Sequence, residues 1–181
     1  MWQDFDLQMI ETNGIRLRVA VEGDDPLLIL VHGWPELWYS WRHRIKPLAQ
    51  AGYRVVVPDV RGYSGSDKPE PVEAYDMANL TAGLIGFIDA FAAETAILIG
   101  HDWGAPICWN TATFYPERVS AIASLSVPCH RRLDISETEL WRRLYGDDFF
   151  YQLYFQAEGA AEAELLYRRQ PGCDATLRAG S

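Results

Sequence analysis

The chain has 181 residues, of which 49% are hydrophobic and 23% charged, and its formal net charge is −9. This composition is typical of one globular domain, and the negative charge argues against a nucleic acid or an anionic membrane surface as the main partner. The first residues lack the basic and apolar regions of a signal peptide and no apolar run approaches the roughly 20 residues of a membrane span, so we expect a soluble, cytoplasmic protein.

The chain opens with patterns typical of strands. Residues 7–12 and 15–21 alternate between polar and apolar side chains around Asn13-Gly14, a pair that strongly indicates a hairpin. Residues 27–31 form a continuous apolar run, as expected of a strand that is covered on both faces.

Helical and strand patterns then alternate. Ser40 is placed to cap a helix that reaches Ala49, and residues 53–57 predict the next strand. Asp76 is expected to open a second helix, whose apolar side chains recur with the helical period. These side chains belong to Met77, Leu80, Leu84, Phe87, Ile88 and Phe91.

The remaining elements complete an α/β pattern. Residues 96–99 predict a strand, residues 104–115 a helix that ends at Pro116, and residues 119–125 another strand. Strands that alternate with helices predict a mostly parallel sheet with helices on both faces.

After Pro128 the pattern changes to a crowd of aromatic residues, which we expect on helices. They are Trp141, Tyr145, Phe149, Phe150, Tyr151, Tyr154 and Phe155. From Tyr167 onward the apolar periodicity disappears, which predicts loop or disorder. The predicted organisation is an α/β core over 1–128, a partial helical cap over 129–166 and an atypical tail over 167–181.

The three cysteines, Cys108, Cys129 and Cys173, do not have the spacing of metal ligands. Their odd number and spacing predict free thiols in a reducing compartment. We expect no metal ion and no cofactor, and the oligomeric state stays open.

The stretch GHDWG, residues 100–104, lies between a predicted strand and a predicted helix, which is the context of a nucleophile elbow. Gly100 and Gly104 supply the small residues that such a tight turn requires, and Asp102 occupies the position of the nucleophile. His101 adjoins Asp102, but neighbours in a tight turn point in different directions, so we do not expect His101 to act as a base. The alternative is a strand–helix turn with an aspartate cap.

A second motif, HGWPE, follows the strand at 27–31. An elbow needs a backbone N–H from this loop to complete an oxyanion hole, and the N–H groups of Trp34 and Trp103 are the expected donors. Gly33 and Pro35 support the motif, and His32 is expected to be structural. The sequence does not decide whether tryptophans 34, 38 and 41 line a pocket or the core. We expect residues 61–67 to form a structured loop on the active-site side.

Five stretches occur together in this chain. They read HGWPE, PDVRGYSGSDKP, GHDWGAPICW, PERV, and YQLYFQ followed by AEAEL. In this combination residues 7–166 resemble the epoxide hydrolase branch of the α/β-hydrolase fold. The resemblance implies that Asp102 attacks the carbon of a small apolar epoxide, that Trp34 helps to form the oxyanion hole, and that Tyr151 donates to the epoxide oxygen from a helical cap.

The chemistry of a carboxylate suits this reaction. An aspartate is already ionised at neutral pH, so it can displace a leaving group at saturated carbon without a base. The product is an ester on Asp102, which water must then hydrolyse. The alkoxide that leaves needs a proton, which a phenol such as that of Tyr151 can supply. From spacing alone, core packing is the favoured role for Tyr151.

The family places a histidine base and its carboxylate after the cap, whereas the last histidine of this chain is His130. We therefore expect a truncated or frame-shifted product that ends inside the cap, with an incomplete sheet, and that is inactive or limited to the first half-reaction. Two alternatives stay open: a haloalkane dehalogenase-like enzyme, and a non-catalytic fragment or binding protein.

Overall fold

The computed structural model describes residues 5–129 and 134–167. The chain divides into two compact units between His130 and Arg131. The first unit begins with the predicted hairpin, formed by β1 (Leu7–Thr12) and β2 (Ile15–Glu22). Asn13 and Gly14 both have positive φ, 47° and 73°, as a tight type I′ turn requires.

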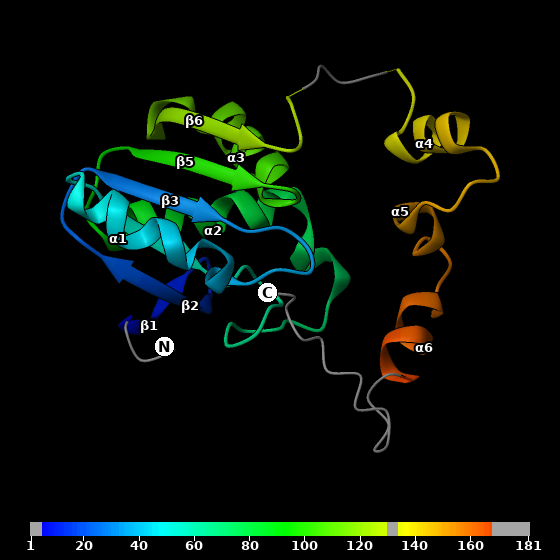
Figure 1. Ribbon diagram of the computed structural model, residues 1–181, viewed down its shortest axis with the longest axis horizontal. Coiled ribbons are helices and arrows are strands. Elements are labelled where there is room, and N and C mark those ends of the chain that lie inside the picture. The colour runs from blue at the N-terminus through cyan, green and yellow to red at the C-terminus, as the bar shows by residue number, and fades with distance from the viewer. Residues whose placement is uncertain (1–4, 130–133, 168–181) are drawn as a thin grey trace. The chain divides into compact units, whose positions relative to one another are not determined.

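A six-stranded sheet of order β1-β2-β4-β3-β5-β6 forms the centre of this unit (Figure 1). The other strands are β3 (Leu27–Val31), β4 (Arg54–Pro58), β5 (Ala96–His101) and β6 (Val119–Leu125). The hairpin pairs antiparallel with β4, and the pairs from β4 to β6 are parallel. The predicted mostly parallel sheet is therefore confirmed.

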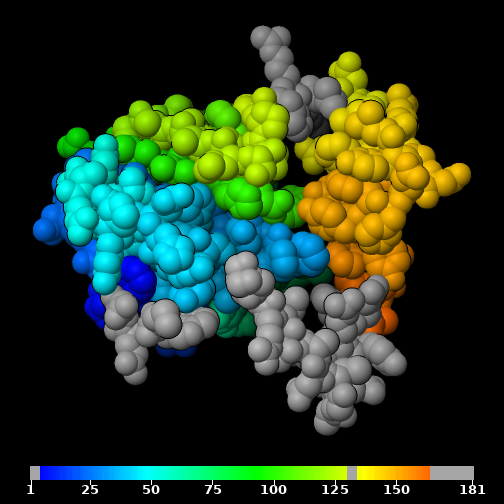
Figure 2. Space-filling view, in the orientation of Figure 1, coloured from blue at the N-terminus to red at the C-terminus, as the bar shows by residue number. Residues whose placement is uncertain are grey.

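Helices cover both faces of the sheet, as predicted. On one face lies α1 (Arg42–Gln50), and on the other lie α2 (Met77–Ala90) and α3 (Gly104–Phe114). Alternate residues of β3 enter two separate cores: Leu28 and Leu30 pack with the α1 side, and the remaining residues of β3 with the α2 side. This two-sided burial explains the continuous apolar run. In Figure 2 the side chains of α1 and its surroundings, coloured cyan, cover part of the near face of this unit.

The helix predicted from Ser40 begins later than expected. Ser40 lies in the short 3₁₀ helix η2 (Trp38–Trp41), and α1 starts at Arg42 without a side-chain cap. The reason is tertiary. The side chain of Trp38 is buried, and its backbone N–H donates to the carboxylate of Asp59 at 3.1 Å, which holds this segment as a separate turn. The predicted cap of α2 is confirmed, because Asp76 accepts from the N–H of Asn79 at 2.7 Å.

Two further 3₁₀ helices complete the first unit, η3 (Val72–Tyr75) and η4 (Pro116–Arg118). Cys108 is buried and Cys129 exposed, and both are free thiols as predicted, whereas Cys173 lies outside the described residues. Burial raises the pKa of Cys108, so this thiol stays protonated. None of the helices described for this chain is long and apolar enough to cross a membrane.

The second unit contains α4 (Glu137–Tyr145), α5 (Tyr151–Tyr154) and α6 (Ala160–Tyr167). The predicted aromatic residues lie on α4 and α5 or beside them. Rings of α4 contact Phe150, which stacks on Tyr145 with ring centroids 4.3 Å apart. Helix α6 includes Tyr167, the residue where loop or disorder was predicted to begin; residues 168–181 lie outside the described residues.

Candidate active site

Asp102 occupies a sharp turn between β5 and α3. Its φ is +50°, in the left-handed region that residues other than glycine rarely adopt. Its N–H donates to the carbonyl of Leu125 at 3.3 Å, and its carbonyl accepts from the N–H of Ala105 at 3.0 Å. This strained strand–turn–helix geometry is the one that the GHDWG motif predicted.

The glycines of the two motifs allow backbones to approach closely. A Cβ at Gly100 would overlap the carbonyl of Gly104, and a Cβ at Gly104 would overlap the carbonyl of Val31. A Cβ at Gly33 would lie 2.8 Å from Cγ of Asp102. Only glycine fits at these three positions, so the loop after β3 and the turn after β5 are in direct contact.

The backbone N–H of Trp34 donates to Oδ1 of Asp102 at 2.9 Å. The other carboxylate oxygen, Oδ2, receives no hydrogen bond from the part of the chain that the structure describes. Trp103 follows Asp102 directly at the start of α3, where backbone N–H groups point toward negative charge. The side chains of Trp34 and Trp103 are 37% and 42% exposed, so apolar surface lies beside the carboxylate, whereas Trp38 belongs to the core.

His32 is buried and both its ring nitrogens contact the backbone. The N–H of Val60 donates to Nε2 at 2.9 Å, so the proton of the neutral ring lies on Nδ1, which donates to the carbonyl of Gly33 at 2.8 Å. Burial lowers the pKa of His32 below its ordinary value of 6.5. These contacts fasten the loop after β3 to the end of β4, and they leave neither nitrogen for catalysis.

Glu36, for which the sequence suggested no function, contacts His101. Its Oε2 lies 3.0 Å from Nδ1 of His101, and the side chains of Glu36 and His101 are 30% and 36% exposed. The same oxygen lies 3.5 Å from the N–H of Gly33, and the N–H of Glu36 donates to the carbonyl of Gly33 at 3.0 Å. The only signal in the sequence was that each residue belongs to one of the two motifs.

Asp59, at the end of β4, anchors the surrounding loops. Its carboxylate is fully buried and accepts from Arg18, with Nε at 2.8 Å and Nη2 at 2.6 Å, as well as from the N–H of Trp38. Ser66 donates to the carbonyl of Asp59 at 2.6 Å. The loop over 61–67 is closed by the N–H of Gly62, which donates to the carbonyl of Asp67 at 3.0 Å. This loop is therefore structured, as expected.

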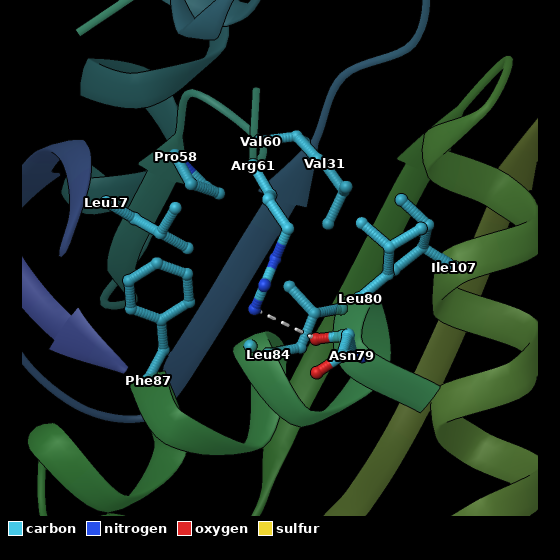
Figure 3. A pocket seen from close by; sticks show the side chains of 11 residues that line it. Leu17, Val31, Pro58, Val60, Arg61, Asn79, Leu80, Leu84, Phe87 and Ile107 are labelled. Carbon is cyan, nitrogen blue, oxygen red and sulfur yellow. Dashed lines mark hydrogen bonds between the residues drawn. The ribbon is translucent and has the colours of Figure 1, made fainter. Parts of the chain in front are cut away.

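A pocket on the α2 and α3 side of the sheet does not include Asp102 (Figure 3). Arg61, which is 6% exposed, extends into it among apolar side chains, and its Nη2 lies 3.5 Å from the carbonyl of Asn79. Burial lowers the pKa of Arg61. The space holds about one water, which is far below what a substrate requires. We therefore regard this pocket as part of the core packing.

Tyr151 is the one predicted catalytic residue that belongs to the second unit. It is the first residue of α5, its hydroxyl accepts from Nε2 of Gln152 at 3.1 Å, and its ring packs edge-on against Phe150. It is partly buried. Within 5–129 and 134–167, no group of three or more histidine, cysteine, aspartate or glutamate side chains is arranged to hold a metal ion.

The first comparison with known proteins concerns the fold. Residues 26–171 match the model of the family described as the alpha/beta hydrolase fold. The matched range includes both motifs and the strand–turn–helix around Asp102.

Individual relatives within this family are named epoxide hydrolases. Epoxide hydrolase A of Mycobacterium tuberculosis (strain ATCC 25618 / H37Rv) is 51% identical over 160 residues, which are 87% of this chain and 50% of that protein. Bifunctional epoxide hydrolase 2 of Mus musculus is 46% identical over 153 residues, 84% of this chain and 27% of that protein. The crystal structure of Epoxide Hydrolase A from Mycobacterium thermoresistibile matches with a TM-score of 0.85 and 54% identity, and the match covers 89% of this chain and 51% of that one.

The chain thus spans about half the length of Epoxide hydrolase A and less of the bifunctional protein. The resemblance to epoxide hydrolases that the motifs predicted is confirmed by these relatives.

Proposed function

Because this chain belongs to the α/β-hydrolase fold family, we propose that it is the part of an epoxide hydrolase that carries the nucleophile, Asp102. The observation that carries this proposal is the hydrogen bond from the N–H of Trp34 to Oδ1 of Asp102. It gives the two oxygens of one carboxylate different surroundings, and the reaction needs them to differ.

In the first step Oδ2 of Asp102 attacks a carbon of the epoxide. A bond forms between Oδ2 and carbon, the carbon–oxygen bond of the strained ring breaks, and the electron pair goes to the ring oxygen, which takes up a proton. The product is a hydroxyalkyl ester of Asp102. Oδ1, held by Trp34, becomes the carbonyl oxygen of that ester. The exposed rings of Trp34 and Trp103 favour a small apolar substrate.

Tyr151 is the proposed source of the proton, by analogy with the epoxide hydrolases that this chain resembles. Tyr151 is the first residue of the short helix α5, and its phenol ring packs against Phe150 in an aromatic cluster. A neutral phenol can donate to an alkoxide as it develops, without carrying a charge into an apolar site.

In the second step water attacks the ester carbonyl, negative charge develops on Oδ1, and the acyl–oxygen bond breaks to release a diol and the Asp102 carboxylate. The N–H groups of Trp34 and Trp103 would stabilise that charge. A base must take the proton of the water, which contributes roughly 10²- to 10⁴-fold to the rate. Of the histidines in the part of the chain that the structure describes, His32 is engaged by backbone, His43 is exposed and His101 is paired with Glu36. We therefore expect ester formation to outrun ester hydrolysis in this chain.

Intact-mass spectrometry after incubation with a reactive epoxide tests the proposal. We expect one added epoxide mass in the chain, none in Asp102→Asn, and slower addition in Tyr151→Phe. A terminal haloalkane tested in parallel separates the dehalogenase alternative, which would release halide. If neither reagent modifies Asp102 and no diol forms, the chain acts as a non-catalytic fragment. Diol production over many turnovers would show that a base operates here.

A further inference from the structure

Two side chains beside the elbow have no part in the reaction described above. Glu36 comes from the loop after β3 and His101 from the last position of β5, and their contact joins the loop to the strand. We propose that this contact is a second link between the loop after β3, which carries the Trp34 N–H, and the turn that carries Asp102. Glu36 and His101 are then positioning residues for Asp102. The functional part of this inference rests on the proposed function.

Two hydrogen bonds connect the loop after β3 to the turn around Asp102 at neighbouring positions. Trp34 reaches Asp102 at 2.9 Å, and two residues further along the loop Glu36 reaches His101, the residue before Asp102, at 3.0 Å. One hydrogen bond permits rotation of the loop about the contact, whereas two contacts at neighbouring positions fix both distance and orientation.

Glu36 transmits this constraint through the loop itself. Its backbone N–H closes a turn on the carbonyl of Gly33, and its carboxylate lies 3.5 Å from the N–H of Gly33. Gly33 is the residue that packs directly on the side chain of Asp102. A shift of Glu36 would therefore move Gly33 and Trp34 together relative to the carboxylate.

The small contribution that the Glu36–His101 contact can make to the free energy of unfolding favours a role in positioning over a role in stability. Each side chain of the pair is about one third exposed, and such pairs contribute little to global stability because solvent screens them. An oxyanion hole, however, requires its donors within a few tenths of an ångström of the developing charge. A weak contact at this place can thus change the reaction while the free energy of unfolding stays the same.

Variants that break or keep the contact test the proposal. Glu36→Met and His101→Leu remove the acceptor and the donor. Glu36→Gln keeps an acceptor oxygen, and His101→Asn keeps an N–H near the position of Nδ1. Matched controls are Glu70→Met and His43→Leu, at exposed positions elsewhere. The measured quantities are the exchange rate of the Trp34 amide proton, by NMR on the full chain, and the rate of adduct formation with the epoxide.

We expect the breaking variants to exchange the Trp34 amide about five- to tenfold faster and to form the adduct several-fold more slowly. The two conservative variants should stay within about twofold of the unmodified chain, because a positioning contact needs a hydrogen bond rather than a titrating group. The double variant should be no worse than either single one, since both remove the same interaction.

If the exchange rate of the Trp34 amide proton is unchanged in the breaking variants, the Glu36–His101 contact does not hold the loop, and the proposal is overturned. If Glu36→Gln and His101→Asn slow adduct formation as much as the breaking variants do, the pair does not act by positioning, and a role in proton transfer is favoured. If the unmodified chain forms no adduct at all, the proposed function fails. The amide exchange rates still decide whether the Glu36–His101 contact holds the loop.

Discussion

The backbone N–H of Trp34 and Oδ1 of Asp102 are 2.9 Å apart, although 68 residues separate them along the chain. Strands β3 and β5 are parallel neighbours, so the loops that leave their carboxyl ends meet at one edge of the sheet. Ligand and catalytic sites of α/β sheets lie at this edge. A carboxylate in a strained turn and an N–H that orients it are the minimal parts of the proposed nucleophile.

Replacing Gly33 with alanine should impair this contact. The added Cβ would collide with the side chain of Asp102, which supplies its three nearest atoms, whereas φ of Gly33 is not positive and adds no backbone strain. We expect adduct formation at least about tenfold slower and a loss of about 1–3 kcal/mol in the free energy of unfolding. Gly83→Ala is the control: its nearest atom would be 3.7 Å away in the middle of α2, and alanine there should raise stability by up to about 1 kcal/mol. Equal adduct rates for both variants would contradict the close approach.

Asp59→Ala should be strongly destabilising. The Arg18–Asp59 and Arg118–Asp89 pairs have the same N–O distance, 2.6 Å, but the Asp59 side chain is 0% exposed and that of Asp89 is 62% exposed. Without the Asp59 carboxylate, the buried N–H of Trp38 and the guanidinium of Arg18, which is 28% exposed, lose their acceptor, and each such loss costs about 1–3 kcal/mol. An exposed pair contributes only about 0–1 kcal/mol. Urea unfolding of Asp59→Ala and Asp89→Ala measures the difference, and similar losses would show that Asp59 does not anchor the loops.

The burial of His32 should make stability depend on pH. Its pKa is lowered in the folded state, so between that lowered pKa and 6.5 the unfolded chain binds more protons than the folded one. The free energy of unfolding therefore falls as the pH drops below 6.5, and this loss is complete once the pH is below the folded-state pKa. His32→Gln should reduce the slope of stability against pH in this window, and His43→Gln, at an exposed position, should keep it. The same slope in all three proteins would rule out His32 as the cause.

The edge strand β6 should promote self-association. Among the strands that the structure describes it pairs with β5 alone, and Leu125 at its end is 44% exposed. Open apolar edges invite pairing between molecules, and a lysine at the edge prevents it. Light scattering at increasing protein concentration should show less association for Leu125→Lys. Phe114 is 51% exposed but lies on helix α3 and offers no strand edge for pairing, so Phe114→Lys should have a smaller effect. A monodisperse monomer before any substitution would be evidence against this prediction.

The sequence by itself determined the features that depend on near neighbours. The Asn13-Gly14 turn, the cap at Asp76 and the continuous apolar run of β3 follow from local backbone preferences and from the pattern of burial. The strand–turn–helix geometry around Asp102 was predictable for the same reason, since a strand, a turn with small residues and a helix are consecutive in the chain. The family resemblance added a role for Asp102 that spacing alone did not contain.

Only the tertiary structure decided which distant residues meet. Ser40 has the chemistry of a helix cap, yet the contact of Trp38 with Asp59 sets where α1 begins. The pairing of Glu36 with His101 depends on the adjacency of β3 and β5, which no local pattern specifies. The physical reason is that a hydrogen bond acts over about 3 Å, and the order of the strands, set by the burial of both sheet faces, determines which side chains come within that distance.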